Sequence, residues 1–230
     1  GGIGSVPGSE GFGNDYELDP EYAYAETCAA LASLFWNWEM AQLTNQAKYS
    51  DLFEWQLYNA AAVGMGLDGT SYLYNNPLTC RGGVTRKPWY SVPCCPSNLS
   101  RTWADLGKYI YSFNQDEIFI HQYISSKYDG ELAKIEIRSE LPWTGKVKIT
   151  VDTSVPSEFT LNLRLPSWCE TDSTRITCNG EFFPVTPAPQ QNEITASGYD
   201  PREGRWLNLK RIWNSGDVVE LKFEMPIQLR

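Results

Sequence analysis

The first half of the chain carries apolar residues at helical spacing. Between residues 21 and 112 they recur every three or four positions, which predicts helices at 21–47, 49–65 and 97–112. On the first helix the predicted apolar face contains Ala29, Ala32 and Trp36. The segment 67–96 between the last two helices is rich in Gly and Pro, which predicts a long irregular connection of the kind that often carries function.

The second half alternates between apolar and polar residues with period two. The alternation falls in short runs that turn residues separate: EIFIHQYIS, ELAKIEIRS, KVKITVD, EFTLNLRLP, RWLNLKR and DVVELKFEM. This pattern is typical of an antiparallel β-sandwich. We therefore expect an α+β, multidomain chain with a helical part at 1–113 and a sandwich at 114–230.

Charge and composition exclude two classes of partner. The 28 acidic and 19 basic residues give a net charge of −9 without long runs of one sign, so nucleic acid is not expected to bind. No stretch reaches the roughly 18 apolar residues of a membrane helix, and the start lacks the basic and apolar regions of an export signal. Because the chain begins on Gly-Gly-Ile-Gly, we expect it to be a piece of a longer protein.

Candidate metal ligands occur in two places. Glu26 and Cys28 open the first predicted helix, and Cys94 and Cys95 precede the third. Three thiols and a carboxylate make a four-ligand set of the kind that zinc prefers. On spacing alone, buried free thiols or a vicinal disulfide remain alternatives.

Other conspicuous residues have structural explanations. Cys169 and Cys178 flank a predicted hairpin, where a disulfide and two separate thiols are alternatives, and Cys80 is left over. His121, the only histidine, lies in an alternating strand and receives no role. The aromatic and amide groups of residues 72–78 are candidates either for a sugar pocket or for packing.

Several sequence blocks in order carry a family resemblance. They are GGIGS, an E-G-F in a glycine-rich loop, YAETCA, LYNAAAVGMGLDG, YLYNNPL and WYSVPCCPSNLSR. This order resembles glycoside hydrolase family 127, the β-L-arabinofuranosidases, over about the first 110 residues. The resemblance implies the C-terminal part of an (α/α)6 catalytic barrel, followed by the sandwich.

The resemblance also implies a set of site residues. It places Zn²⁺ on Glu26, Cys28, Cys94 and Cys95, makes Cys94 the nucleophile, and makes Glu10 in the glycine-rich loop the acid/base. The implied reaction is retaining hydrolysis of arabinofuranosides, with carbohydrate as the partner. A free thiol is mostly protonated at neutral pH, and metal coordination removes that proton. A thiolate can then replace the usual nucleophilic carboxylate.

The helices of this chain are too few to close an (α/α)6 barrel. We therefore expect a missing N-terminal barrel segment, or a homo-oligomer, to cover the apolar surface that remains. The alternative to catalysis is a non-catalytic carbohydrate-binding fragment with a structural zinc site. Reduced, metal-bound thiols favour the cytoplasm, although zinc also protects thiols in oxidising compartments.

Overall fold

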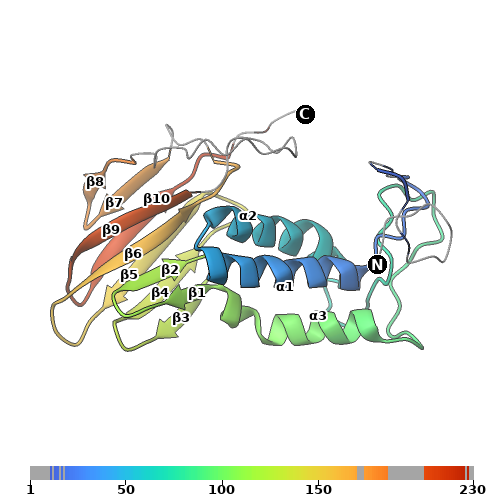
Figure 1. Cartoon of the computed structure of the whole chain (residues 1–230), viewed down its shortest axis with the longest axis horizontal. Helices are drawn as coiled ribbons and strands as arrows, with labels where there is room; N and C mark the ends of the chain where they lie inside the picture. The colour runs from blue at the N-terminus through green and yellow to red at the C-terminus, as the bar shows by residue number, and fades with distance from the viewer. Residues whose placement is uncertain are drawn as a thin grey trace. The chain divides into compact units, whose positions relative to one another are not determined.

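The computed structural model of the chain describes residues 11, 13–15, 17, 19–169, 174–185, 205–225 and 227. The chain divides into two compact units, one formed by Gly1–Met40 with Leu52–Leu106 and the other by Ala41–Asp51 with Gly107–Arg230. Figure 1 shows the helices and strands. The helices are α1 (Thr27–Thr44), α2 (Ala47–Gln56) and α3 (Cys94–Ala104), with a π-helical turn at Leu57–Ala61 and 3₁₀ turns at Ala62–Gly64 and Leu106–Tyr109.

Polar and aromatic contacts join the parts of the three helices that belong to the first unit. Gln56 of α2 donates to the hydroxyl of Ser33 on α1 over 2.7 Å, and Asn37 of α1 donates to the amide oxygen of Gln56 over 3.1 Å. The guanidinium of Arg101 on α3 lies 4.8 Å from the ring centre of Phe35 on α1. These contacts position the beginnings of α1 and α3 within one unit.

The sequence pattern predicted the wrong buried face for the first helix. The buried face of α1 includes Leu31, Leu34 and Trp38, whereas Trp36, placed on the predicted face, is 66% exposed. The error arises because α1 is apolar on all sides, so that its sequence favours no single face. A helix of this kind normally lies inside a larger structure.

The helix bounds also differ from those expected. The first helix begins at Thr27 and not at residue 21, and the third begins at Cys94 and not at residue 97. The predicted end of the third helix, up to residue 112, is instead a 3₁₀ turn followed by strand β1 at Tyr111–Phe113.

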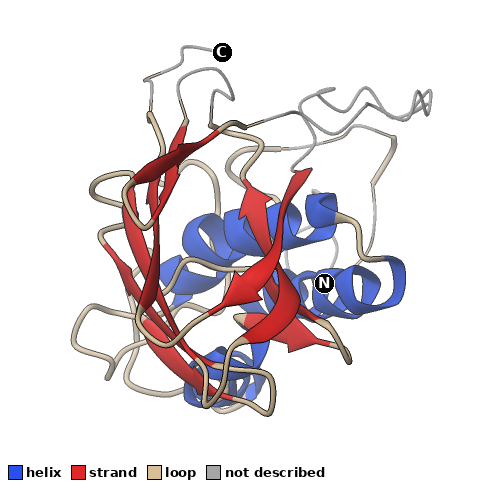
Figure 2. Ribbon diagram, turned by 90° about the vertical axis from the view of Figure 1, so that its left-hand side faces the viewer, coloured by secondary structure: helices blue, strands red, loops and turns tan. Residues whose placement is uncertain are grey.

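The second unit contains two sheets. One has the order β1–β2–β6–β9 and the other the order β3–β4–β5–β10–β7–β8, and Figure 2 shows them as two layers. The remaining strands are β2 (Glu117–Ile120), β3 (Ser126–Asp129), β4 (Lys134–Ser139), β5 (Lys146–Asp152), β6 (Ser157–Leu165), β7 (Arg175–Cys178), β8 (Glu181–Phe183), β9 (Arg205–Trp213) and β10 (Asp217–Lys222).

Alternation along the strands builds one core between the two sheets. Buried Ile118 and Leu161 of the four-stranded sheet join Ile135, Ile149 and Leu221 of the six-stranded sheet in a single cluster. The expected sandwich of antiparallel strands is confirmed, with one exception, because β2 pairs with β6 in parallel. The fold class predicted from the sequence, helices followed by a sandwich, is therefore correct.

Residues 41–51 belong to the sandwich unit, where a buried polar network holds them. The two ring nitrogens of His121 lie 2.7 Å from the hydroxyls of Ser50 and Ser112. Arg164 forms a buried ion pair with Asp51 and donates to the backbone carbonyl of His121. His121 is thus a satisfied core residue, in agreement with the absence of a predicted role.

Among the described residues, none of the helices combines the length and the apolar character that a membrane crossing requires.

Candidate metal centre

The four candidate ligands come from the starts of two helices. Glu26 immediately precedes α1 and Cys28 lies in its first turn, while Cys94 and Cys95 are the first two residues of α3. Helix starts carry unpaired backbone N–H groups and the positive end of the helix dipole. Both helices therefore favour negative charge where their thiols and carboxylate lie.

An irregular segment after α2 fixes the start of α1. The backbone N–H of Thr27 donates to the carbonyl of Tyr74 over 2.9 Å, and its hydroxyl donates to the carbonyl of Leu73 over 2.9 Å. The N–H of Asn76 in turn donates to the carbonyl of Ala25 over 3.0 Å. Gly64, next to this segment, has no room for a Cβ atom, since one would lie 2.8 Å from the Thr27 methyl group. The segment that the sequence predicted as irregular is thus part of the site's framework.

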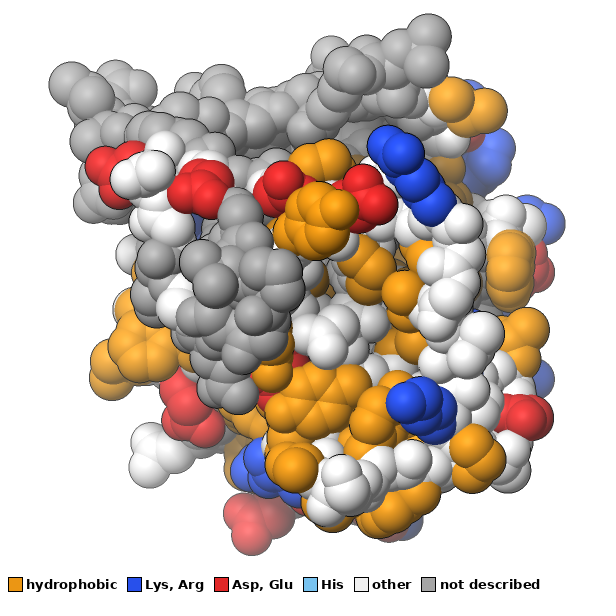
Figure 3. All heavy atoms as spheres, turned by 90° about the vertical axis from the view of Figure 1, so that its right-hand side faces the viewer, with side chains coloured by type: hydrophobic (Ala, Val, Ile, Leu, Met, Phe, Trp, Pro, Cys, Tyr) orange, Lys and Arg blue, Asp and Glu red, His pale blue; other side chains and the backbone are white. Residues whose placement is uncertain are grey.

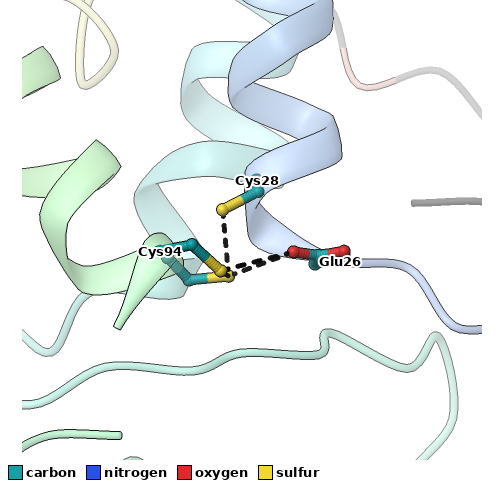
Figure 4. Close-up of side chains that lie close together, drawn as sticks. Glu26, Cys28 and Cys94 are labelled. Atoms are coloured by element: carbon teal, nitrogen blue, oxygen red, sulfur yellow. Dashed lines mark hydrogen bonds between the residues drawn. The ribbon is translucent and has the colours of Figure 1, made fainter. Parts of the chain in front are cut away.

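The ligand atoms converge on one point (Figure 4). The Sγ atoms of Cys94 and Cys95 each lie 3.7 Å from Oε1 of Glu26, and they are 3.9 Å from each other. The Sγ atom of Cys28 lies 3.3 Å from that of Cys95, and all four ligand atoms lie within 4.8 Å of one another. Ligand atoms held about 2.3 Å from a tetrahedral zinc ion are about 3.8 Å apart, so this donor set fits zinc in both chemistry and spacing.

Burial differs between the two adjacent thiols. Cys95 is completely buried, whereas Cys94 is half-buried and its Sγ atom also lies 3.4 Å from the hydroxyl of Tyr74. Burial raises the pKa of both the Cys28 and the Cys95 thiols. A bound cation would oppose that shift, because it stabilises the thiolate form. Cys94 is thus the more accessible member of the pair.

Two groups around the ligands have roles that sequence reasoning did not assign. The side-chain amide of Asn98 donates to the Sγ atom of Cys28 over 3.3 Å, and the Tyr74 hydroxyl contacts Cys94. The hydrogen bond with Cys94, followed by burial, raises the pKa of Tyr74. Both residues lie in motifs that the sequence singled out, but only the fold shows which ligand each one contacts.

The remaining predicted residues lie elsewhere or are not described. All six cysteines are among the described residues and each is a free thiol, so Cys169 and Cys178 form no disulfide. Cys80 is exposed and lies outside the cluster. Glu10, the predicted acid/base, lies outside the described residues.

The segment beside the site is rich in exposed apolar side chains. They are Leu67, Leu78, Val84, Trp89 and Val92. Figure 3 shows the face of the molecule on which this segment lies, where hydrophobic side chains gather among polar ones. Apolar groups that gather in this way mark a contact surface more often than a solvated loop.

Comparison with known proteins identifies a family for both parts of the chain. The family model for the β-L-arabinofuranosidase GH127 catalytic domain matches residues 1–108, and that for the GH127 middle domain matches residues 117–225. The chain is 30% identical over 249 aligned positions to a non-reducing end β-L-arabinofuranosidase of Bifidobacterium longum subsp. longum, covering 100% of this chain and 35% of the relative.

Solved structures give the same result. A GH127 β-L-arabinofuranosidase from Geobacillus stearothermophilus T6 is 36% identical with a TM-score of 0.79, over 98% of this chain and 36% of that one. A second GH127 β-arabinofuranosidase is 31% identical with a TM-score of 0.78, over 93% of this chain and 34% of that one.

These matches place the chain among the glycoside hydrolases. It belongs to glycoside hydrolase family 127, which confirms the resemblance seen in the sequence blocks. The chain spans about a third of the length of the relatives that it matches.

Proposed function

We propose that the complete protein is a retaining β-L-arabinofuranosidase, with Cys94 as its nucleophile and Glu10 as its acid/base. The observation that carries the proposal is the convergence of Glu26, Cys28, Cys94 and Cys95. Of the two adjacent cysteines, Cys95 is completely buried and Cys94 is partly exposed to solvent. Names of the relatives support β-L-arabinofuranosides as the substrate class.

The four clustered residues are the proposed zinc ligands. When bound, zinc would keep their thiols deprotonated at neutral pH. Glu26 is buried beside the thiols, and its carboxylate supplies the oxygen donor of the set. The starts of α1 and α3 add positive potential, which further favours the thiolate form of Cys94.

Two displacements at the anomeric carbon complete the proposed reaction. In the first, the Cys94 sulfur forms a bond with the anomeric carbon while the bond to the leaving oxygen breaks, and Glu10 protonates that oxygen. In the second, Glu10 accepts a proton from water, whose oxygen bonds to the anomeric carbon as the carbon–sulfur bond breaks. The electron pair returns to the Cys94 sulfur, and the sugar keeps its anomeric configuration.

The complete protein is also proposed to cover the apolar surface of this chain. Because α1 is apolar on all sides, its outer face carries apolar side chains too, and Trp36 there is 66% exposed. Leu67 and Trp89 are exposed in the segment beside the site. The relatives are about three times as long as this chain, so a further barrel segment is the proposed cover.

Zinc content and thiol accessibility together test the proposal. We expect one zinc per complete protein, lost in Glu26→Ala and strongly reduced in Cys94→Ser, and unchanged in the control Cys80→Ser, which changes an exposed thiol outside the cluster. In the Cys80→Ser background, chelation should speed iodoacetamide labelling of Cys94. Cys94→Ser and Glu10→Gln should each lower hydrolysis of an arabinofuranoside by at least about a hundredfold.

Two outcomes would argue against the proposal. A folded protein without zinc would remove the activation of the nucleophile. Zinc binding combined with a Cys94 thiol that stays unreactive after chelation would favour a purely structural site and the alternative of a non-catalytic carbohydrate-binding protein.

A further inference from the structure

The outer face of the six-stranded sheet carries a groove lined by basic side chains. Its volume is about 560 Å³, and it crosses β4, β5, β10 and β7. Alternation along the strands explains its chemistry, since Val147 and Ile149 of β5 are buried in the core while Lys146 and Lys148, which precede each of them, are exposed. The groove has five basic residues, Arg138, Lys146, Lys148, Arg175 and Lys222, and two acidic ones, Glu140 and Glu220.

Strand register places three of these cations side by side. Lys222 of β10 pairs directly with Lys146 of β5 on one side and with Arg175 of β7 on the other. Like charges at directly opposite positions destabilise a sheet. This row of positive charge also contrasts with the chain as a whole, whose net charge is −9. The arrangement is therefore one that an anionic ligand would stabilise.

Neighbouring acids neutralise this row only in part. Lys222 lies 3.1 Å from Glu224 and Lys146 lies 4.0 Å from Glu140, but all four side chains are at least half exposed, so that solvent screens these pairs. Within the part of the chain that the structure describes, neither Lys148 nor Arg175 has an ion-pair partner. The groove keeps a net positive field.

An exposed tryptophan lies in the turn that joins two strands of the groove. Trp143 is 88% exposed and lies in the turn between two lining residues, Glu140 and Lys146. The turn is ordered: the N–H of Glu140 donates to the carbonyl of Lys146, and the N–H of Phe223 donates to the carbonyl of Gly145, each over 2.9 Å. Gly145 is required there, because a Cβ atom would lie 1.8 Å from the carbonyl oxygen of Phe223. The indole is thus presented on a fixed turn.

We propose that this groove binds an acidic oligosaccharide, a sugar chain that carries carboxylates. Adjacent strands, which carry these cations, are about 4.8 Å apart, close to the length that one pyranose unit adds to an extended chain. In an extended peptide, successive side chains on the same face are about 6.6 Å apart. Arg175 can hold a carboxylate through two hydrogen bonds, and Trp143 offers an apolar face to a sugar ring. The choice of a sugar chain rests on the proposed glycosidase function.

Binding of trigalacturonate to the complete protein, measured by calorimetry, tests the inference. We expect one site, an affinity that falls as salt rises, and no binding of the uncharged trisaccharide galactotriose. Lys148→Gln combined with Arg175→Gln should weaken binding at least about tenfold, because each removes a charged hydrogen-bond donor. Trp143→Ala should also weaken it. Lys210→Gln, which removes an exposed cation of β9 in the other sheet, is the matched control and should change nothing.

Stability gives an independent readout. Lys222→Gln removes the middle charge of the row, so it should raise the unfolding temperature while it weakens binding, which no folding defect would produce. Failure of trigalacturonate to bind, or binding that the groove variants leave unchanged, would overturn the inference. The inference would also be overturned if poly-glutamate bound as well as trigalacturonate and its binding did not depend on Trp143. That result would indicate an acidic protein partner. None of these variants touches the metal cluster, so zinc content and thiol labelling test the proposed function separately.

Discussion

The Sγ atoms of Cys28 and Cys95 lie 3.3 Å apart although 67 positions separate them in the sequence. Cys28 is on the first turn of α1 and Cys95 on the first turn of α3, so the contact joins two helix starts. The segment that contains Tyr74 pairs with the start of α1 and brings its hydroxyl to Cys94. The ligands and their surroundings therefore form one connected structure, and this makes the contribution of each neighbour testable.

Asn98→Ala is expected to weaken zinc binding without abolishing it. The Asn98 amide donates to Cys28 Sγ over 3.3 Å, and loss of such an outer contact typically lowers metal affinity about 10- to 100-fold. Competition with a chromophoric chelator measures the change. Ser97→Ala, at the exposed neighbouring position on the same helix, should leave the affinity unchanged. An unaltered affinity in Asn98→Ala would show that its amide does not support the metal site.

Tyr74→Phe is expected to lower kcat while zinc content stays the same. The variant removes only the hydroxyl that lies 3.4 Å from the Cys94 sulfur, and a hydrogen bond to a charged group contributes about 1.5 to 3 kcal/mol. This corresponds to a decrease of roughly ten- to a hundredfold. Tyr90→Phe serves as the comparison, because the Tyr90 hydroxyl contacts the backbone at Tyr72 and Tyr74 and no ligand sulfur. A proportional loss of zinc in Tyr74→Phe would instead assign it a role in holding the cluster.

Sequence reasoning singled out the four residues that cluster in the structure but misplaced the start of the helix that holds two of them. The irregular segment was predicted to run to residue 96, so the third helix was expected to start at residue 97. Proline is tolerated in a first helical turn, where the backbone N–H groups have no partner within the helix, and α3 therefore begins at Cys94. This difference matters chemically, because it places both thiols at the positive end of the helix dipole.

Assignment of residues 41–51 to the sandwich unit could not be predicted. Their helical pattern continues that of the neighbouring residues, whereas the contacts that hold them, such as Ser50 with His121, span 71 positions. Period-two alternation did predict the strands well, because each strand has one face in the shared core. The parallel pairing of β2 with β6 depends on chain connectivity, which alternation does not encode.

Asp51→Ala is expected to destabilise the sandwich unit strongly. Arg164 is completely buried, and Asp51 provides its ion-pair partner as well as an acceptor for the N–H of Ser167 over 3.1 Å. Removal of one partner from a buried ion pair leaves an uncompensated charge and typically costs about 3 to 5 kcal/mol. Urea unfolding measures the loss.

Asp129→Ala provides the comparison for Asp51. Its pair with Lys134 is 2.9 Å long, but both side chains are more than 60% exposed, so the variant should change the free energy of unfolding by less than about 1 kcal/mol. Equal effects of the two variants would contradict the role given to the buried pair.

His121 is expected to make stability depend on pH in the weakly acidic range. Burial, and then the charge of Arg164, lower the pKa of His121 from 6.5 to about 3. Asp51 forms an ion pair with that guanidinium and neutralises it in part. As pH falls below 6.5, the unfolded chain takes up a proton that the folded protein does not. The stabilising contribution is therefore complete above pH 6.5 and is lost as the pH falls toward 3.

Unfolding by urea at pH 7 and pH 5 measures this effect. Over that interval the loss should be about 2 kcal/mol, at about 1.4 kcal/mol for each pH unit below 6.5. His121→Gln should be less stable than the wild type at pH 7, because it loses a contact with Ser50 or Ser112, but its stability should change much less between the two pH values. The chain has a single histidine, so no other imidazole in it titrates over this range. An equal decline in the wild type and in His121→Gln would show that carboxylates, and not His121, produce the dependence.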